Sequence, residues 1–290
     1  MRVKKRMMVC FLLPCILLFA LIYLIPMGIV FVTSFCEWKS GGVFHFVGLH
    51  NYIEAFVNDT RMHQALKNTG IWALLQSTVH VGIGTITAFI LSRKIKGWKI
   101  LRTIFMIPNV ISAAALGVIF LNVFNPKYGL LNSMISTLSG STFSKNWYFD
   151  QNSAFLTVTW SWLLYAGLVM ILVLAGVMSV PEDVLEAARI DGASGLQIDF
   201  KIKLPLVRTI LGTCVIISAT SMLREFELIY LTTNGGPGDT TLNLPLYLYK
   251  TSLTDNNYGY ANMMGVLLII LGIFAVFAIN KLFRMSESDY

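Results

Sequence analysis

The sequence predicts an all-α integral membrane protein with six transmembrane helices. Hydrophobic residues make up 56% of the 290-residue chain and charged residues only 13%, whereas roughly a quarter of the residues in soluble domains are charged. The mean hydropathy is +0.68. A soluble domain of this composition would lack the polar side chains that its surface needs, so the composition excludes a soluble enzyme and a disordered chain.

Six runs of about 20 mostly apolar residues are each long enough to cross a bilayer as a helix. We place them at about residues 9–35, 70–91, 103–124, 154–178, 209–231 and 260–280. The first run follows a basic head that imitates a signal peptide, but it is too long for one and no small-residue cleavage site follows it. We therefore expect an uncleaved first span within a single transmembrane domain over residues 1–290.

The distribution of Lys and Arg predicts the orientation of these spans. With the N-terminus in the cytoplasm, 15 of the 22 basic residues fall in inner segments and six in outer loops. Basic residues concentrate on the cytoplasmic side of membrane proteins, so both termini are expected to be cytoplasmic. The net charge of +7 is then a topology signal, and no nucleic-acid partner is predicted. The basic loop at residues 93–102 either contacts membrane lipid or simply fixes the topology.

The inner segment between the fourth and fifth spans carries the caps of two short helices. Ser179 with Glu182 makes a capping box for the first helix, and Gly192 is placed to end that helix with a positive φ. Ser194 with Gln197 makes a capping box for the second helix. A capped helix pair held between two spans predicts a stiff projection from the membrane.

The first of these two helices offers a surface suited to a protein partner. Ala187 and Ala188 are small enough for close approach, and Glu186 carries a carboxylate that pairs with a partner's Arg. The segment at residues 179–208 resembles the EAA loop of ABC importer permeases. The positions that match are Glu186, Ala187, Ala188, Gly192, Ile202, Leu204 and Pro205.

This resemblance implies the type I importer permease fold, with a cytoplasmic coupling helix between the fourth and fifth spans. It also implies that the loop contacts a dimer of cytoplasmic ATPases. The residues implied for this contact are Glu186, Ala187, Ala188, Asp191 and Gly192. ATP and Mg would be bound by the partner ATPase. This chain is therefore not expected to be an enzyme or to bind a cofactor or metal itself. The sequence contains no GxxxxGKS/T, HExxH or GxSxG motif.

Three further motifs are similar to those of binding-protein-dependent sugar permeases. They are VGLHNY at residues 47–52, LRTIFMIP at 101–108 and LTTNGGP at 231–237. The last resembles the maltose-permease-F member of a permease pair, although the extra N-terminal spans and large periplasmic insertion of that protein are absent. The chain is more similar to the shorter multiple-sugar or glycerol-phosphate permeases.

This second resemblance implies that a carbohydrate of oligosaccharide size is imported by alternating access. The implied partners are a second permease subunit, the ATPase dimer and an extracytoplasmic solute-binding protein. The implied location is the bacterial cytoplasmic (inner) membrane.

Charged residues inside a span are costly and therefore point to function. The fifth span contains Arg224, Glu225 and Glu227. Arg224 and Glu227 are three residues apart on one helical face and are expected to pair, which turns Glu225 away from them. Glu225 is expected ~9 Å below the outer end of the span. Two interpretations stay open. In the first, at least one of these three residues lines the substrate path. In the second, two of them form a buried ion pair and the remaining carboxylate faces an aqueous vestibule.

The fourth span places Trp160, Trp162 and Tyr165 ~9–17 Å below the outer face, at the depth of Glu225. Sugars present apolar C–H faces and many hydroxyls, so aromatic rings beside carboxylates suit them. The alternative for these rings is an aromatic belt or helix packing. By resemblance, Trp162 falls where the family places a substrate-lining Trp. Also by resemblance, three positions fall where maltose permease F contacts its sugar: Met222, Arg224 and Glu225.

The alternative function is an autonomous ion-coupled secondary transporter or channel that uses Glu225 or Glu227 as its ion site. Inverted repeats and paired discontinuous helices would favour it, and the sequence shows neither. A membrane-embedded enzyme is a third possibility, but the spans contain no nucleophile–base or metal constellation. Gln76 and His80 are four residues apart in the second span and are expected to hydrogen-bond across helices.

Overall fold

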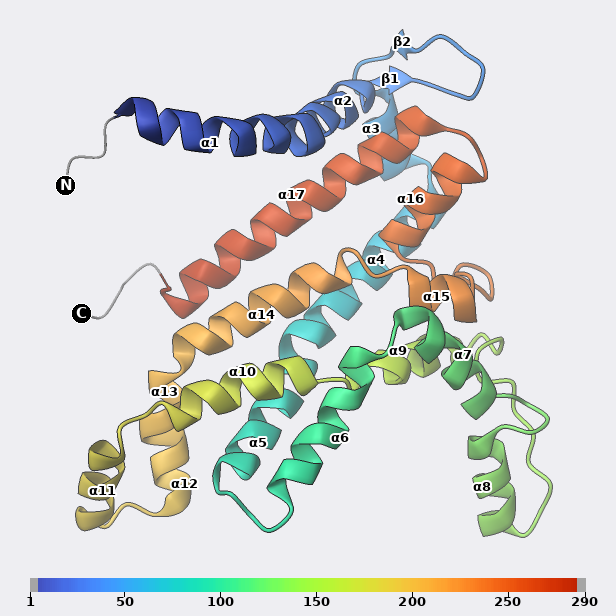
Figure 1. The fold of residues 1–290 in the computed structure, drawn as a ribbon. Helices are drawn as coiled ribbons and strands as arrows, with labels where there is room; N and C mark the ends of the chain where they lie inside the picture. The colour runs from blue at the N-terminus through green and yellow to red at the C-terminus, as the bar shows by residue number, and fades with distance from the viewer. Residues whose placement is uncertain (1–4, 286–290) are drawn as a thin grey trace. The chain divides into compact units, whose positions relative to one another are not determined.

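The computed structural model describes residues 5–285 and is mostly helical (Figure 1). Its contacts divide the chain into two compact units. One unit contains the chain as far as Met62 together with Tyr247–Ile270, and the other contains His63–Leu246 and the chain from Leu271 onward. All candidate site residues from the sequence lie in the second unit.

The first unit begins with an apolar helix that the chain itself does not cover. Its 18-residue apolar window within Phe11–Thr33 has no buried residue, as expected for a helix surrounded by lipid. Asn262 donates a hydrogen bond of 2.8 Å to Thr33 Oγ1 at the end of this helix. The elements of this unit are α1 (Lys5–Phe19), the π-helical turn η1 (Ala20–Leu24), α2 (Ile25–Thr33), the antiparallel strands β1 (Cys36–Glu37) and β2 (His45–Phe46), α3 (His50–Val57), most of α16 (Leu244–Leu253) and the first part of α17 (Tyr258–Phe283).

The second unit contains the remaining helices. Its first three elements form one long helix over Thr60–Ser92. The elements are α4 (Thr60–Leu75), η2 (Gln76–His80), α5 (Val81–Ser92), α6 (Trp98–Val110), α7 (Ala113–Val123), α8 (Leu130–Ser139), α9 (Ala154–Leu163), α10 (Gly167–Met178), α11 (Glu182–Ile190), α12 (Gly195–Ile198), η3 (Asp199–Lys203), α13 (Leu204–Leu206), α14 (Arg208–Met222) and α15 (Glu227–Thr232).

Four helices are each long and apolar enough to cross a membrane alone, and they correspond to the predicted first, second, fourth and sixth spans. They are Phe11–Thr33, Thr60–Ser92, Ala154–Met178 and Tyr258–Phe283. The number reaches six if each of two bent helix pairs counts as one span. The predicted helical membrane fold is therefore confirmed, while the count of six spans stays a prediction.

The third span, predicted as one helix, is broken. α6 and α7 are bent by 104° relative to each other. The break falls at Ile111 and Ser112, both of which have extended backbone. Ser112 then caps α7, because its side chain accepts a hydrogen bond of 3.3 Å from the backbone N–H of Ala115. Serine is a strong N-cap residue, so a new helix start is favoured at this position over an unbroken helix.

The fifth span is also interrupted, because α14 ends at Met222 and α15 begins at Glu227. The four residues between them are not helical. The prediction that the sequence contains no discontinuous helices is therefore wrong at this span and at the third. Both breaks expose backbone polar groups at membrane depth, which proteins tolerate where the backbone is buried in protein or lines a water-filled cavity.

The core of the second unit lies where α5, α10 and α14 pack together (Figure 1). A Cβ atom at Gly84 of α5 would lie only 2.7 Å from the Cβ of Val169 on α10. The small residue thus allows the close contact between these two helices. The fully buried side chains of this core include Ala88, Met170 and Val173.

Candidate functional site

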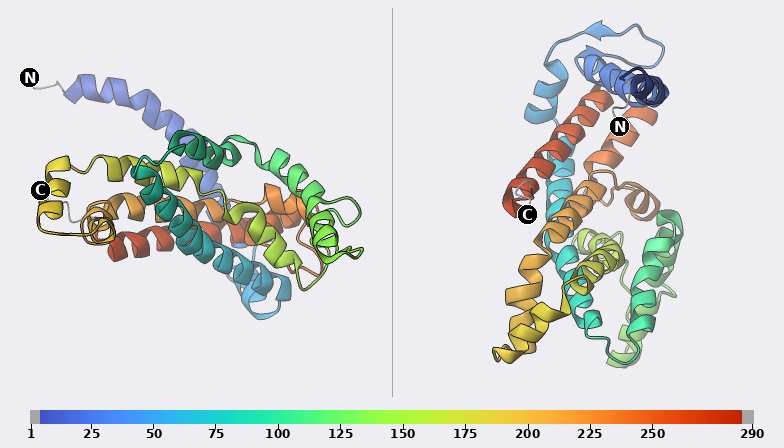
Figure 2. Two further views of the ribbon diagram at one scale, coloured as in Figure 1. Left: turned by 90° about the horizontal axis from the view of Figure 1, so that it is seen from below. Right: turned by 60° about the vertical axis from the view of Figure 1, so that its left-hand side comes forward.

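The loop between α10 and α14 folds as the predicted helix pair. α11 and α12 project beyond the ends of α10 and α14, as Figures 1 and 2 show. Leu185, Ala188 and Ile198 are buried between them and form a small core of their own. The projection is therefore a folded element and not an irregular connection.

The cap predicted for α12 is present, whereas the cap predicted for α11 is wrong. Ser194 accepts from the backbone N–H of Gln197 and the Gln197 side chain accepts in return, which completes a capping box. Ser179 instead ends α10, where its hydroxyl donates to the carbonyl of Gly176 at 2.8 Å. Pro181 takes the N-cap position of α11. Glu182 is drawn into an ion pair of 2.9 Å with Arg189.

Gly192 ends α11 with a φ of +80°, as predicted. The N–H groups of Gly192 and Ala193 donate to the carbonyls of Arg189 and Ala188, at 3.1 and 2.9 Å. This is the Schellman pattern, which requires a left-handed residue at the position of Gly192. No atom lies within 4 Å of a Cβ built on Gly192, so the constraint at this position comes from the backbone alone.

Most, but not all, of the residues predicted to contact the ATPase are exposed on α11. Glu186 and Ala187 are exposed, as is Asp191, which directly follows the helix. Ala188, expected beside them on the contact surface, is only 8% exposed because it packs against the second helix. Ile190 is 86% exposed at the end of the same helix. The surface available to a partner therefore combines an acid, a small residue and a large apolar side chain.

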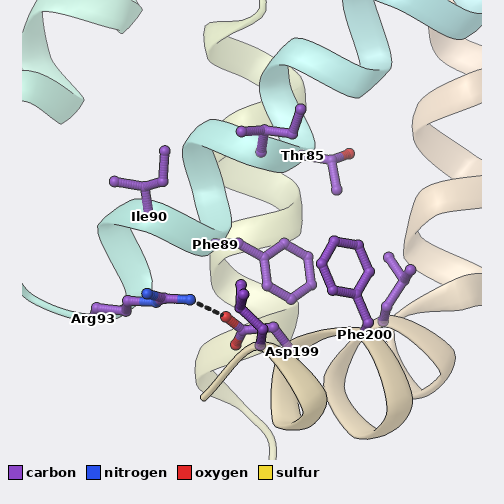
Figure 3. Close-up of a pocket in the computed structure, with 9 residues that line it drawn as sticks. Thr85, Phe89, Ile90, Arg93, Asp199 and Phe200 are labelled. Atoms are coloured by element: carbon purple, nitrogen blue, oxygen red, sulfur yellow. Dashed lines mark hydrogen bonds and ion pairs between the residues drawn. The ribbon is translucent and has the colours of Figure 1, made fainter. Parts of the chain in front are cut away.

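Asp199 joins this loop to the end of α5, a connection that the sequence analysis missed. Its carboxylate is buried and accepts from Arg93 at 2.6 Å (Figure 3). It also accepts from Lys203 at 3.1 Å. The spacing of Asp199 and Lys203, four residues apart, could have predicted the second contact. The partner on α5 is 106 residues away in the chain and leaves no local signal.

A polar cavity of about 250 Å³ lies among the apolar helices of the second unit. Its walls come from η2, α6, the α9–α10 segment and α14, and from the chain that follows α14. Its polar lining residues are Gln76, His80, Asn109, Trp162, Tyr165, Ser218, Ser221 and Glu225. A cavity with this many polar groups at membrane depth is the first candidate for a passage through the protein.

Three polar atoms in this cavity lack a hydrogen-bond partner. Among residues 5–285, the buried side-chain atoms without a partner include Gln76 Oε1, Trp162 Nε1 and Tyr165 Oη, and all three residues line the cavity. Nearly all buried polar atoms in proteins are paired with protein or water. Their convergence provides one acceptor, one donor and one hydroxyl that can do either.

Glu225 occupies the break between α14 and α15. Its carboxylate accepts a hydrogen bond of 3.2 Å from the backbone N–H of Leu228 and so caps α15. Within the described residues, no ion pair joins Arg224 to Glu227, and the predicted pairing is wrong because the two residues are not on one helix. Arg224, Glu225 and Glu227 instead line a second cavity of about 340 Å³. The two cavities share Ser221 and Glu225.

The structure therefore brings together some of the predicted substrate-path residues and separates others. Trp162, Tyr165 and Glu225 line the polar cavity, and Arg224 lines the cavity beside it. Trp160 is 54% exposed and Met222 is buried, and neither lines these two cavities. Their predicted roles in the path have no support in the geometry, although a transport role is not itself tested for any of these residues.

Several residues that line the polar cavity carry no functional signal in the sequence. Asn109, Ser218 and Ser221 were not singled out, because a lone amide or hydroxyl in a span is ordinary. His80 makes the expected contact across helices, with 3.0 Å between Nδ1 and the carbonyl oxygen of Leu163. Gln76 Oε1 has no hydrogen-bond partner, so the contact expected for it across helices is not formed.

Comparisons with known proteins point in one direction. The model of the family described as "Binding-protein-dependent transport system inner membrane component" matches residues 80–285. The multiple sugar-binding transport system permease protein MsmF of Streptococcus mutans is 32% identical, with 93% of this chain and 93% of that protein covered. The arabinooligosaccharides transport system permease protein AraP of Bacillus subtilis is 31% identical, with 92% of this chain and 85% of that protein covered.

A solved structure shares the fold over almost the full length. It is a chain of a bacterial alginate ABC transporter in complex with an alginate pentasaccharide-bound periplasmic protein. The TM-score is 0.85 at 21% identity, with 98% of this chain and 96% of that chain covered. A second structure of a bacterial ABC transporter for alginate import gives a TM-score of 0.83.

Proposed function

Because the chain belongs to the family of binding-protein-dependent transport system inner membrane components, we propose that its polar cavity is part of the path of an imported carbohydrate. The chain is a permease subunit of an ABC importer, and ATP hydrolysis belongs to a separate subunit. Relatives named as permeases for multiple sugars and for arabinooligosaccharides support a sugar of oligosaccharide size as the substrate.

The observation that carries this proposal is the set of unpartnered atoms in the cavity. Gln76 Oε1, Trp162 Nε1 and Tyr165 Oη make no hydrogen bond within the protein, and their residues line one cavity. A sugar hydroxyl both donates and accepts, so it can pair with the acceptor, the donor or the hydroxyl of this set. The Trp162 ring adds an apolar surface on which the C–H face of a sugar can stack.

Glu225 gives the cavity a charged acceptor at the point where it meets the second cavity. Its backbone position is fixed by the helix break and by the hydrogen bond that Asn243 Nδ2 donates to its carbonyl. A carboxylate accepts stronger hydrogen bonds than a neutral group does. A sugar that moves from one cavity to the other would pass this carboxylate, because both cavities contain it.

The α11–α12 projection is the proposed site of coupling to the ATPase dimer, which binds ATP and Mg. Closing of the dimer on ATP moves the projection, and the rigid Gly192 turn passes this movement to α10 and α14. The path then opens alternately toward the solute-binding protein and toward the cytoplasm. A second permease subunit completes the membrane part of the importer.

The proposed orientation places both termini and the α11–α12 projection in the cytoplasm, at the inner membrane of a bacterium. The excess of Lys and Arg in the inner segments supports it. Family membership decides against the alternative of an autonomous ion-coupled transporter, since the family's members work within binding-protein-dependent systems.

Uptake by the reconstituted importer tests the substrate class. The complete complex with its binding protein is placed in vesicles and given labelled monosaccharides, oligosaccharides and, as a non-carbohydrate control, methionine. We expect ATP-dependent uptake of an oligosaccharide and none of methionine. Uptake of an amino acid with no uptake of any sugar would overturn the proposal. Reporters inserted after Ser139 and fused after Tyr290 test the orientation, and an external signal at Tyr290 would contradict it.

A further inference from the structure

A third cavity of the same unit lies outside the proposed sugar path. It measures about 170 Å³ and is formed between the last turns of α5 and the α12–α13 segment (Figure 3). Phe89 of α5 and Phe200 of η3 both point into it (Figure 3). The lining residues are Thr85, Ile86, Phe89, Ile90, Arg93, Leu196, Asp199, Phe200 and Leu204. All but three of them are apolar, so this cavity does not suit a sugar.

The apolar walls of this cavity are strongly exposed. Ile86, Leu196 and Phe200 are 63%, 62% and 66% exposed. Such a surface is stable in contact with hydrocarbon and unfavourable in water, at roughly 25 cal/mol per Å². Ile86 also lies within the apolar helix Thr60–Ser92, six residues before its end and thus ~9 Å inside it. An occupant must therefore reach into the membrane.

The rim of the cavity carries an excess of positive charge. The single carboxylate of Asp199 is shared by Arg93 and Lys203, so two cations meet one anion. Asp199 is buried, while the Arg93 side chain is 50% exposed. Arg93 directly follows the apolar helix, at the depth where lipid headgroups begin. Its guanidinium has five N–H donors in a fork that matches a phosphate.

We propose that this cavity binds one anionic phospholipid. The acyl chain lies along Ile86, Phe89 and Phe200, and the phosphate accepts hydrogen bonds from Arg93. A protein partner in the cytoplasm would meet the rim but would not reach Ile86, ~9 Å inside the apolar helix. An acyl chain does reach it, and an anionic headgroup completes the charge balance at Asp199.

The two walls of this lipid site belong to different functional parts of the chain. One wall is the end of the membrane helix α5, and the other is the second half of the proposed coupling loop. A bound lipid therefore adds contacts between them, beside the ion pair of Arg93 and Asp199. Its effect on transport rests on the proposed coupling role of the loop, whereas lipid binding itself does not.

Lipid binding is measured directly on the complete complex. The complex is reconstituted in nanodiscs of phosphatidylcholine with or without phosphatidylglycerol, and the lipids retained on release are identified by native mass spectrometry. Arg93→Gln removes the phosphate donor but leaves the Asp199–Lys203 pair intact, so no buried carboxylate loses its only partner. Ile86→Trp fills the apolar part and leaves the rim charges unchanged. Lys96→Gln is the matched control, because it removes a neighbouring positive charge that does not line the cavity.

We expect the wild type and Lys96→Gln to retain one phosphatidylglycerol in preference to phosphatidylcholine. Arg93→Gln should bind it at least 10-fold more weakly, since a hydrogen bond to a charged group is lost. Ile86→Trp should also lose it. Equal retention of both lipids, or equal retention of phosphatidylglycerol by all variants, overturns the proposal. Loss of the ATPase from Arg93→Gln with unchanged lipid retention would also overturn it, by showing that the cavity is a protein contact.

Discussion

The position of a single residue within a helix decides whether its side chain lines the polar cavity. Trp160 and Trp162 lie two residues apart in α9, and their residue type does not distinguish their roles. A helix turns by about 100° per residue, so the two rings point roughly 200° apart and only one can face a given cavity. Residue type and spacing do not say which one, and only the family resemblance favoured Trp162. Packing settles it, because Trp162 is 7% exposed and lines the polar cavity, while Trp160 is 54% exposed and does not.

Replacing each of these tryptophans separately tests the assignment. Trp162→Ala should lower sugar uptake by about 10-fold, because the stacking surface and the indole N–H donor are both lost. Trp160→Ala is the matched control and should transport like the wild type. The measurement is initial uptake in vesicles at equal protein content. Equal loss in the two variants would show that the aromatic residues act in packing or as a belt.

Glu225 has two roles that a conservative variant separates. Glu225→Gln keeps an acceptor for the Leu228 N–H and so preserves the cap of α15, but it removes the charge from the cavity. A hydrogen bond to a charged acceptor contributes ~1.5–3 kcal/mol, so uptake should fall by about 10- to 100-fold while the complex still assembles. Glu225→Ala should lose the cap in addition and lower the thermal stability. Normal uptake by Glu225→Gln would leave the carboxylate with a structural role only.

At the scale of elements, local rules predict the proposed coupling loop between α10 and α14 better than they predict the broken spans. The Ser194–Gln197 capping box and the Gly192 turn follow from residues close together in the chain. The break between α14 and α15 does not, because it depends on partners such as Asn243, which is 18 residues from Glu225. A hydropathy profile shows each broken span as one continuous apolar run. It therefore finds the membrane segment and misses the interruption in the helix.

The Gly192 turn gives a prediction at this scale. A β-branched residue is strained at a φ of +80°, whereas Asn tolerates it. Gly192→Val should therefore distort the end of α11, weaken ATPase binding and lower uptake strongly, and Gly192→Asn should retain most of the activity. Copurification of the ATPase and uptake are the measurements. If both variants behave alike, the turn conformation is not what the coupling loop requires.

A second prediction for the elements concerns Asp59, which precedes α4 and contacts α16 and α17 within the first unit. The carboxylate of Asp59 accepts hydrogen bonds from Tyr247 at 2.6 Å and from Tyr260 at 2.7 Å. Partial burial alone would raise the pKa of Asp59, but these bonds and the backbone N–H of Met62 outweigh it and lower the pKa. The resulting stabilisation is present above the ordinary carboxyl pKa of about 3.9 and is lost as the pH falls through the lowered value.

Asp59→Asn should therefore lower the thermal unfolding temperature at pH 7, and the difference from the wild type should shrink as the pH falls below about 4. Tyr260→Phe should show part of the same loss at pH 7, because one of the two hydroxyl donors remains. Melting curves of the purified complex at several pH values provide the measurement. A difference that does not change with pH would show that the ionised carboxylate is not the stabilising group.

At the scale of the whole molecule, composition, span length and the loop motif predicted a helical membrane permease, and the fold and family comparisons confirm it. The polar cavity could not be predicted from the sequence in the same way. It combines atoms from η2, α6, the α9–α10 segment and α14, which the sequence does not place next to one another. The sequence predicted three of its lining residues as path residues from polarity and aromaticity: Trp162, Tyr165 and Glu225. The unpartnered atoms that define its chemistry are visible only once the helices are packed.

In the proposed function, one part of the chain carries the sugar while another part couples its movement to the ATPase. The most direct test of this division measures sugar uptake beside binding-protein-stimulated ATP hydrolysis in vesicles, for Trp162→Ala and Glu186→Lys. Trp162→Ala should lose uptake but keep the stimulated ATPase activity, because the coupling loop is intact. Glu186→Lys should lose both, since repulsion would replace the attraction proposed for this side chain at the ATPase contact. Loss of ATPase stimulation in parallel with uptake in Trp162→Ala, or wild-type uptake in Glu186→Lys, would contradict this division.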